Sequence, residues 1–378
     1  MPAALGPSLD AVIAQALSSR RLVACVVLVM RDGKPAYQRA AGLADREAGR
    51  PMQLDTLFRL ASVSKPIVST AAMALVAAGR LELDAPIHRW LPDFRPALAD
   101  GRVPDISLRQ LLTHTSGLGY RFLESDADGP YARAGVSDGL DRVDISLQDN
   151  LRRLASVPLL FTPGSQWRYS LGVDVVGALI EAATGMPLAA AVQNLVGAPL
   201  GWRDTGFTAT APERLAAIYI NDAPQPRRMQ AAETIAPFPE TVGIAFAPAR
   251  VFDRHAFGSG GAGMVGSAFE VLHLLDTLRQ GGTGLLPPAV VEDMARNQTG
   301  DLAPPDTPGT GFGLGFSVLH DPAAAGSPES AGTWRWGGAY GHAWFVDRAR
   351  GISVVALTNT LYEGMSGAFV GDVRDAIY

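Results

Sequence analysis

The sequence lacks most of the residues that several classes of function would require. Its single cysteine, Cys25, stands in an apolar, strand-like run, so no disulfide can form within the chain. A net charge of −5 and arginine pairs that are scattered rather than clustered argue against a nucleic-acid partner. No apolar run approaches about 20 residues, so we expect no membrane span. No H-E-x-x-H motif or cysteine–histidine cluster occurs, so we expect neither a metal nor another cofactor.

The N-terminus has no basic region in front of an apolar run, so we expect a cytoplasmic protein without a signal peptide. With 378 residues, 47% of them hydrophobic, the chain can bury a large core as one elaborate domain or two. The composition is that of a soluble globular protein, and it leaves the oligomeric state open.

Lysine is also scarce, and this makes one stretch stand out. Among 32 Lys+Arg residues, only Lys34 and Lys65 are lysines. Arginine keeps its proton in proteins, whereas lysine can lose it when it is desolvated. Lys65 follows Ser62 by three residues in Ser-Val-Ser-Lys, so the two side chains face the same way on a helix. The pair is typical of a serine nucleophile with a lysine base, and the alternative is a surface S-x-x-K produced by chance.

The residues that follow favour the catalytic interpretation. Residues 67–78 are apolar almost all round, which predicts a helix buried in a sizeable protein, and Gly79 is a suitable stop. Pro66 is tolerated only in the first turn, so the helix begins close to Ser62. The positive end of the helix dipole then favours a developing alkoxide on Ser62 and a neutral Lys65.

Strand patterns occur at both ends of the chain, in residues 22–30 and 35–41 and again in residues 333–336, 342–347 and 352–359. We expect an α/β (α+β) fold in which both termini contribute to one central antiparallel sheet flanked by helices. Residues 1–79 and 246–378 would form a discontinuous domain, and residues 80–245 a mostly helical inserted domain. A cleft between the two is the expected ligand site.

Two further stretches fit a serine hydrolase. Tyr169 follows a turn-rich loop and precedes a helical pattern, where it could share a proton with a serine and a lysine. Residues 336–342, Trp-Gly-Gly-Ala-Tyr-Gly-His, join two strands, and glycines there let backbone N–H groups approach an oxyanion. The alternatives are a tyrosine that anchors a loop and an ordinary glycine-rich hairpin. His114, in Leu-Leu-Thr-His-Thr-Ser-Gly-Leu, is interpreted as structural rather than as a base.

Two motifs are interpreted as decoys. Residues 135–139 match G-x-S-x-G around Ser137, but loop-like sequence lies on both sides, where a nucleophile elbow needs a strand and a helix. Residues 258–263 match G-x-G-x-x-G, but no strand clearly precedes them. We interpret this glycine-rich segment as a loop that borders the cleft.

In combination and in this order, S-x-x-K, L-L-T-H-T-S-G-L, the tyrosine motif and the glycine-rich third box resemble the serine β-lactamase and penicillin-binding-protein superfamily. The resemblance spans residues 22–359. Class C β-lactamases have Y-x-N and K-[ST]-G at the last two motifs, where this chain has Tyr169-Ser170-Leu171 and Trp336-Gly337-Gly338. These departures are similar to the family VIII carboxylesterases.

The resemblance implies catalysis by Ser62 as nucleophile, Lys65 as proton acceptor or relay and Tyr169 as proton donor to the leaving alcohol. It implies an oxyanion hole formed by the N–H groups of Ser62 and Ala339. Trp336 would replace the third-box lysine, which weakens recognition of the carboxylate that β-lactams carry. The predicted substrate pocket is lined by Trp336, Gly337, Gly338, Tyr120, Phe122, His342 and Trp344, and Asp174 is predicted to support the site from behind.

The resemblance therefore implies a carboxylesterase that hydrolyses short-chain or bulky uncharged esters through an acyl-enzyme. A β-lactamase or D,D-peptidase is the nearest alternative, and an acyltransferase of the same fold differs only in the acceptor. A binding or scaffold protein on this fold is a further alternative, which the intact Ser62, Lys65 and Tyr169 disfavour.

Overall fold

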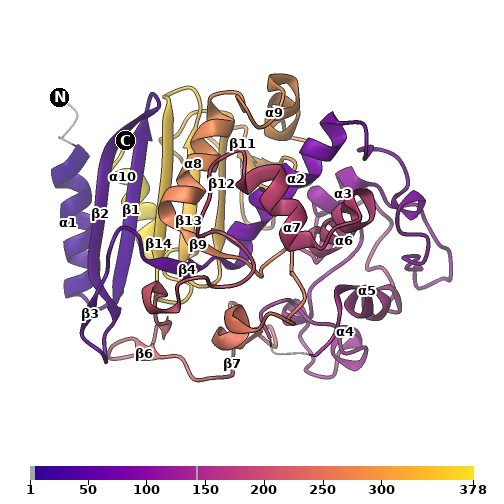
Figure 1. The fold of residues 1–378 in the computed structure, drawn as a ribbon, viewed down its shortest axis with the longest axis horizontal. Helices are drawn as coiled ribbons and strands as arrows, with labels where there is room; N and C mark the ends of the chain where they lie inside the picture. Colours follow the sequence, from indigo (N-terminus) through magenta and orange to yellow (C-terminus); the bar gives the residue numbers. More distant parts are fainter. Residues whose placement is uncertain (1–4, 142–143) are drawn as a thin grey trace.

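The computed structural model describes residues 5–141 and 144–378. Its largest element is an eight-stranded sheet in the order β10-β11-β12-β13-β14-β1-β2-β3 (Figure 1). All neighbouring strands are antiparallel. The prediction of one sheet built from both ends of the chain is confirmed. The strands are β1 (Ala24–Arg31), β2 (Lys34–Asp45), β3 (Arg50–Pro51), β10 (Thr310–Phe312), β11 (Ser317–Leu319), β12 (Thr333–Gly338), β13 (His342–Asp347) and β14 (Ile352–Thr358).

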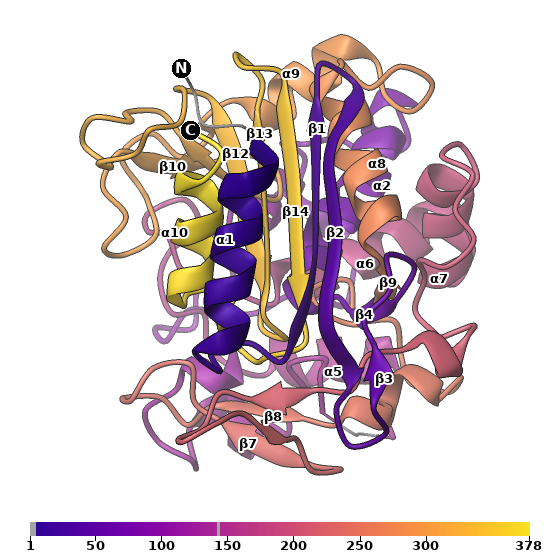
Figure 2. The ribbon, with the colours of Figure 1, turned by 90° about the vertical axis from the view of Figure 1, so that its left-hand side faces the viewer.

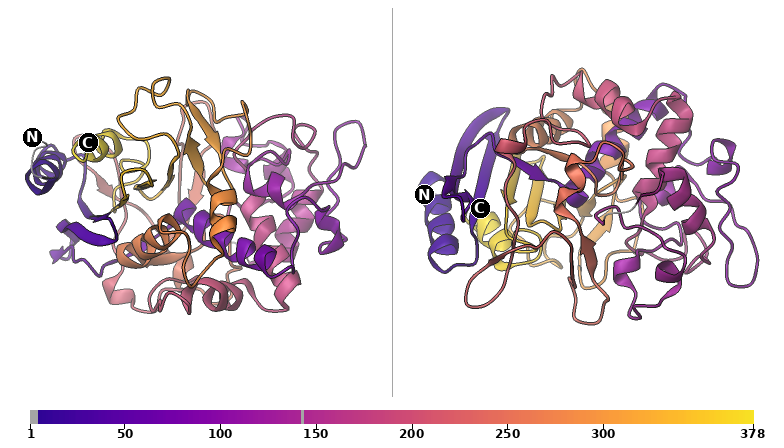
Figure 3. Two further views of the ribbon diagram at one scale, coloured as in Figure 1. Left: turned by 90° about the horizontal axis from the view of Figure 1, so that it is seen from above. Right: turned by 60° about the horizontal axis from the view of Figure 1, so that its bottom comes forward.

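Helices cover both faces of this sheet. Figure 2 shows α1 (Leu5–Ser18) and α10 (Ala368–Asp375) in front of the strands, with α2 (Ser64–Ala77) and α8 (Ala268–Arg279) behind them. Seen from above in Figure 3, the two terminal helices lie together at one side of the molecule. The helices α1 and α10 are therefore neighbours, although they stand at opposite ends of the sequence.

Strand β1 is buried on both faces, which explains its continuous apolar run. Cys25 and Val27 point to the core under α1 and α10, and Val26 and Leu28 point to the main core under α2 and α8. This alternation is the period of two that a strand imposes on its side chains. Burial raises the pKa of the Cys25 thiol to about 12, so the thiol stays protonated and serves as a core residue.

The middle of the chain packs its helices against α2. Within it, α6 (Gly172–Thr184) contacts both α2 and α3 (Leu108–Leu112). The main hydrophobic core draws residues from this region and from the sheet, so the division into two domains stays a prediction.

The remaining helices and strands are short. They are α4 (Pro130–Arg133), α5 (Leu147–Ala155), α7 (Leu188–Val192), α9 (Pro288–Ala295), and the two-stranded pairs β4 (Leu57–Arg59) with β9 (Val265–Ser267), β5 (Tyr219–Ile220) with β6 (Arg227–Arg228), and β7 (Glu233–Ile235) with β8 (Ile244–Phe246).

Over residues 5–141 and 144–378, no single helix is long and apolar enough to cross a membrane. The helix α6 and the segment Leu188–Gly197 reach that length and composition only as a pair bent by 80°.

The turn between β12 and β13 carries the glycine-rich third box and requires a glycine at its corner. Gly341 has φ of +107°, and a Cβ added to it would lie 2.1 Å from the carbonyl oxygen of Thr360. Gly332, before β12, also has a positive φ of +84°, but a Cβ there would meet nothing within 4 Å. Both glycines therefore need a positive φ, but only at Gly341 would a side chain also collide with neighbouring atoms.

Alanine at Gly332 should cost about 1–3 kcal/mol of unfolding free energy, from backbone strain alone. Alanine at Gly341 should cost about 1–3 kcal/mol more, because the turn must also move away from Thr360. Urea unfolding of the two variants, with activity measured in parallel, checks this. Equal losses in both variants would contradict the crowding argument.

Candidate active site

Ser62 lies in a short 3₁₀ turn, η1 (Ala61–Val63), between β4 and α2. The residue before it, Ala61, has φ of +45°, a left-handed conformation that is unusual for a residue other than glycine. Helix α2 follows directly, with Pro66 in its first turn, as the sequence predicted. Backbone strain of this kind is common where a side chain must be held at a functional position.

Three side chains converge at this turn. Ser62 Oγ lies 2.6 Å from Tyr169 Oη, and Lys65 Nζ donates to Ser62 Oγ over 3.1 Å. Lys65 is fully buried and also donates to the carbonyl oxygen of Gly261 over 2.8 Å. Among the described residues it forms no ion pair with a carboxylate. A hydroxyl, an amine and a phenol are thus within direct reach of one another in a mostly enclosed place, which is the arrangement that nucleophilic catalysis needs.

Lys65 reaches Gly261 because the glycine-rich segment 258–263 lies against α2. A Cβ on Gly260 would lie 2.5 Å from the carbonyl oxygen of Val173 on α6, so only glycine lets the segment pack this closely against α6. The interpretation of the segment as a loop at the cleft agrees with its place beside Lys65. Its carbonyl contact with Lys65 was not predicted, because a backbone oxygen leaves no signal in the sequence.

Tyr169 is held by the segment that contains His114. The N–H of Arg168 donates to the carbonyl oxygen of His114 over 2.9 Å, and His114 Nδ1 lies 3.1 Å from Ser170 Oγ. The His114 ring centroid is 4.8 Å from that of Tyr169. Burial, with the nearby charge of Lys65, lowers the pKa of His114, which keeps the ring neutral. Its contacts are those of a structural residue, as the sequence analysis interpreted it.

The end of β12 abuts the turn that carries Ser62. A Cβ on Gly338 would lie 2.5 Å from the carbonyl oxygen of Leu60. In the part of the chain that the structure describes, the N–H groups of Ser62 and Ala339 donate no hydrogen bond. Two backbone donors without partners near the nucleophile fit an oxyanion hole, whose donors must be preorganised. The assignment of Ser62 and Ala339 to this role stays a prediction.

Aromatic rings surround Tyr169. The ring centroids of Tyr120, Trp336 and Phe122 lie 5.0, 5.4 and 6.5 Å from that of Tyr169. Lys65 Nζ lies 4.6 Å from the Tyr169 centroid and 5.4 Å from the Tyr120 centroid. Tyr120, Phe122 and Trp336 therefore lie beside the site, where the sequence placed them, and Gly337 and Gly338 follow Trp336 on β12.

The placement of His342 and Trp344 in the substrate pocket stays a prediction, and the structure buries both side chains. His342 is fully buried, with Nε2 2.8 Å from the carbonyl oxygen of Arg59. Trp344 is 1% exposed and packs against Phe316, with centroids 5.9 Å apart. Both residues lie on β13, a central strand whose faces are covered by helices. The sequence pattern could not distinguish this strand from β12, where Trp336 is half-buried.

The nucleophile-elbow motif is a buried loop. Ser137 is fully buried, and its hydroxyl contacts the side chain of Asp141 and accepts from the N–H of Gly139 over 3.1 Å. Its own N–H donates to Asn150 Oδ1 over 2.8 Å. Structural hydrogen bonds thus account for Ser137, in agreement with its interpretation as a decoy.

Asp174 is a buried carboxyl group behind Lys65. It lies in the first turn of α6 and is 1% exposed, and among the described residues neither oxygen has a hydrogen-bond partner. A Cβ on Gly261 would lie 2.5 Å from Asp174 Oδ2, so the carboxyl group faces the segment that binds Lys65. Burial raises the pKa of Asp174 to about 6, although the Ser259 side chain and the charge of Lys65 both act to lower it. Its supporting role stays a prediction.

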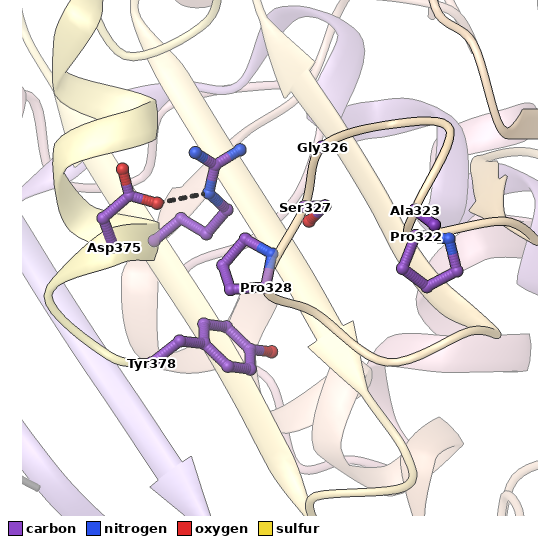
Figure 4. A pocket seen from close by; sticks show the side chains of 8 residues that line it. Pro322, Ala323, Gly326, Ser327, Pro328, Asp375 and Tyr378 are labelled. Atoms are coloured by element: carbon purple, nitrogen blue, oxygen red, sulfur yellow. Dashed lines mark hydrogen bonds and ion pairs between the residues drawn. The ribbon is translucent and has the colours of Figure 1, made fainter.

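A second hollow lies elsewhere on the surface. A depression of about 590 Å³ lies between residues 322–328 and the C-terminal end of α10. Figure 4 shows the side chains that line it. Its polar groups are already paired, because Arg374 contacts Asp375 over 2.7 Å and the Tyr378 hydroxyl donates to Asp347 over 2.8 Å. It contains none of the three converging side chains, so the site at Ser62 is the candidate active site.

Comparison with known proteins agrees with this site. Residues 9–377 match the Beta-lactamase family, so the chain belongs to that family. It is 57% identical over 378 residues to Esterase EstB of Burkholderia gladioli, which covers 100% of this chain and 96% of that protein. The solved structure of EstCE1, "a hydrolase with promiscuous acyltransferase activity", is 45% identical with a TM-score of 0.94, covering 99% of this chain and 98% of that one.

A more distant relative is a transferase. Monacolin J acid methylbutanoyltransferase of Aspergillus terreus is 28% identical over 382 residues, covering 90% of this chain and 87% of that protein. Taken with the fold, the family match and the two similar hydrolases define this chain as a serine hydrolase with a β-lactamase/transpeptidase-like fold.

Replacing Asp174 with Asn should change how stability depends on pH. The ionised carboxylate is penalised in the folded state, so its cost is absent below the unfolded pKa of about 3.8 and complete above about pH 6. The stability of the variant relative to the natural protein should therefore rise by up to about 3 kcal/mol between pH 4 and pH 8. Urea unfolding across this range measures the difference.

Asp84→Asn is the control, because Arg109 holds the pKa of Asp84 below its usual value. That variant should be less stable than the natural protein by a nearly constant amount between pH 4 and pH 8, because the stabilisation of Asp84 by Arg109 is lost only at lower pH. A flat difference for Asp174→Asn would contradict burial as the cause of its shift.

Proposed function

We propose that this protein is a serine carboxylesterase that hydrolyses short-chain or bulky uncharged esters through an acyl-enzyme on Ser62. The observation that carries the proposal is the contact of Ser62 Oγ with Tyr169 Oη at 2.6 Å and with Lys65 Nζ at 3.1 Å. The similarity to Esterase EstB and to the hydrolase EstCE1 supports it.

In the proposed acylation step, Ser62 Oγ attacks the ester carbonyl carbon while Lys65 accepts or relays the hydroxyl proton. The carbonyl oxygen becomes an oxyanion that accepts hydrogen bonds from the N–H groups of Ser62 and Ala339. The bond to the alcohol oxygen then breaks, and Tyr169 donates a proton to the departing alkoxide. The products are the free alcohol and an ester between the acyl group and Ser62.

In the proposed deacylation step, a water molecule gives a proton to Tyr169 and attacks the acyl carbonyl carbon. The bond to Ser62 Oγ breaks, the acid leaves, and Ser62 regains its proton from the Lys65–Tyr169 pair. The three groups return to their starting states, so no cofactor is needed to balance the reaction.

Trp336 favours an ester over a β-lactam as substrate. The resemblance places it where β-lactamases have a lysine that would attract the substrate carboxylate. Its ring instead lies against Tyr169 and Phe312, with centroids 5.4 and 5.2 Å away, and presents an apolar surface. Such a wall binds uncharged groups and gives a carboxylate no partner to offset its desolvation.

Acyl transfer to an alcohol is a second candidate activity. The aromatic surroundings of Tyr169 suit an apolar acceptor better than water, and EstCE1 is described as having promiscuous acyltransferase activity. Intact-mass analysis of the acyl-enzyme, with and without added alcohols, separates the two activities. Loss of the acyl group as a new ester supports transfer, and loss as the free acid alone supports hydrolysis.

Ser62→Ala should lower kcat/KM for p-nitrophenyl esters at least about 10³-fold, because it removes the nucleophile. Tyr169→Phe should lower kcat about 10²–10⁴-fold, because it removes only the proton-transferring hydroxyl and keeps the ring contacts. Ser137→Ala is the matched serine control and should leave kcat within a few-fold. The proposal fails if Ser62→Ala keeps its activity, or if nitrocefin is turned over as fast as the esters.

A further inference from the structure

Phe312 contacts three rings of the aromatic cluster around Tyr169, although nothing in the local sequence marks it. It is the last residue of the edge strand β10, and its side chain is fully buried. Its ring centroid lies 5.1 Å from that of His114, 5.2 Å from Trp336 and 5.5 Å from Trp167. The contacts with His114 and Trp336 are edge-to-face, the geometry that aromatic pairs prefer.

Each of these three rings also contacts Tyr169. The centroid distances from Tyr169 are 4.8 Å to His114, 5.4 Å to Trp336 and 6.5 Å to Trp167. Phe312 therefore forms an outer layer that supports three of the rings around Tyr169. The distance of 2.6 Å between Tyr169 Oη and Ser62 Oγ depends on the tilt of the Tyr169 ring, which these neighbours restrict.

The backbone around Phe312 is held firmly. Its N–H donates to Thr299 Oγ1 over 3.1 Å, and its carbonyl oxygen accepts from the N–H of Gln298 over 2.8 Å. A Cβ on Gly311 would lie 2.3 Å from Asn297 Oδ1, and one on Gly313 would lie 2.3 Å from the carbonyl oxygen of Met294. The two flanking glycines thus let β10 pack closely on the segment behind it.

We propose that Phe312 is a positioning residue, which holds the Tyr169 hydroxyl against Ser62 through Trp336, Trp167 and His114. The proposal rests on the proposed function, because it takes Tyr169 as the residue that transfers protons to and from the substrate. Phe312 takes no part in the hydrogen bonds that join Ser62 to Tyr169 and Lys65. Loss of its ring would free the three supporting rings and let Tyr169 tilt away from the nucleophile.

Phe312→Leu is the test, and Phe316→Leu is its matched control. Phe316 is also fully buried and lies between two tryptophans, with centroids 5.2 Å from Trp334 and 5.9 Å from Trp344. It contacts none of the rings around Tyr169, so its loss perturbs the core without reaching the site. The two variants should therefore lose similar thermal stability.

Phe312→Leu should lower kcat for p-nitrophenyl esters at least about tenfold, because small displacements of a catalytic group have large effects on rate. KM should change less than kcat, and the pH profile of kcat should shift, because the hydrogen bond between Tyr169 and Ser62 is altered. Phe316→Leu should keep kcat within about twofold and the natural pH profile. Equal kcat losses in both variants, or a Phe312→Leu enzyme with natural kcat and pH profile, would overturn the proposal.

Labelling of Ser62 by a phosphonate ester, followed by intact mass, separates this proposal from the proposed function. If the natural protein hydrolyses no ester, the proposed function fails, but slower labelling of Phe312→Leu than of Phe316→Leu still supports positioning. If Phe312→Leu and Phe316→Leu are instead labelled at equal rates, the positioning role of Phe312 is overturned. If Phe312→Leu does not fold, Phe312→Met keeps most of the volume without the ring and is compared in the same way.

Discussion

The candidate site depends on one close approach between two stretches of backbone. Gly338, at the end of β12, lies so near to η1 that any side chain there would collide with the carbonyl group of Leu60. Because η1 carries Ser62 and β12 leads to Ala339, this contact sets the distance between the two N–H groups that are predicted to form the oxyanion hole. An oxyanion is stabilised best by donors that are already in place, so the end of β12 and the turn that follows it must be rigid. The turn at Gly341 and the packing of β13 against its neighbours supply that rigidity.

The polar groups of the site are held at a cost to stability. Lys65 is buried without a carboxylate partner among the described residues, the carboxyl group of Asp174 is buried, and Ala61 has a strained φ. Each of these features is unfavourable alone. Ala61 precedes Ser62 in the chain, Lys65 donates to Ser62, and Asp174 faces the glycine-rich segment that binds Lys65. The apolar core around α2 and α6 offsets them. Concentration of unfavourable features in one place is what a site selected for reactivity is expected to show.

Much of this arrangement could be predicted from local sequence. The run 22–30, the box at 336–342 and the helix after Pro66 each follow from short-range patterns, and the structure confirms them. Ser62 and Lys65 were identified because their spacing and the scarcity of lysine are visible in the chain. Tyr169 could be identified because it stands between a turn-rich loop and a helix pattern.

What could not be predicted depends on tertiary contacts. Trp336 and Trp344 are paired across β12 and β13, yet only one is half-exposed, because helices cover the central strand. The carbonyl oxygen of Gly261 and the ring of Phe312 take part through long-range contacts that no local pattern records. Phe312 in particular lies in a three-residue edge strand, too short to give a recognisable alternation.

The pairing of β1 with β14 joins the first strand of the chain to its last. Strands β12, β13 and β14 must therefore be made before β1 finds its partner on that side, and Ala339 comes with them. During synthesis, more than three hundred residues precede Ala339, so Ser62, Lys65 and Tyr169 are all made before the residue that is predicted to complete the oxyanion hole. A chain that lacks β14 leaves the apolar β1 without its partner on that side and open to aggregation.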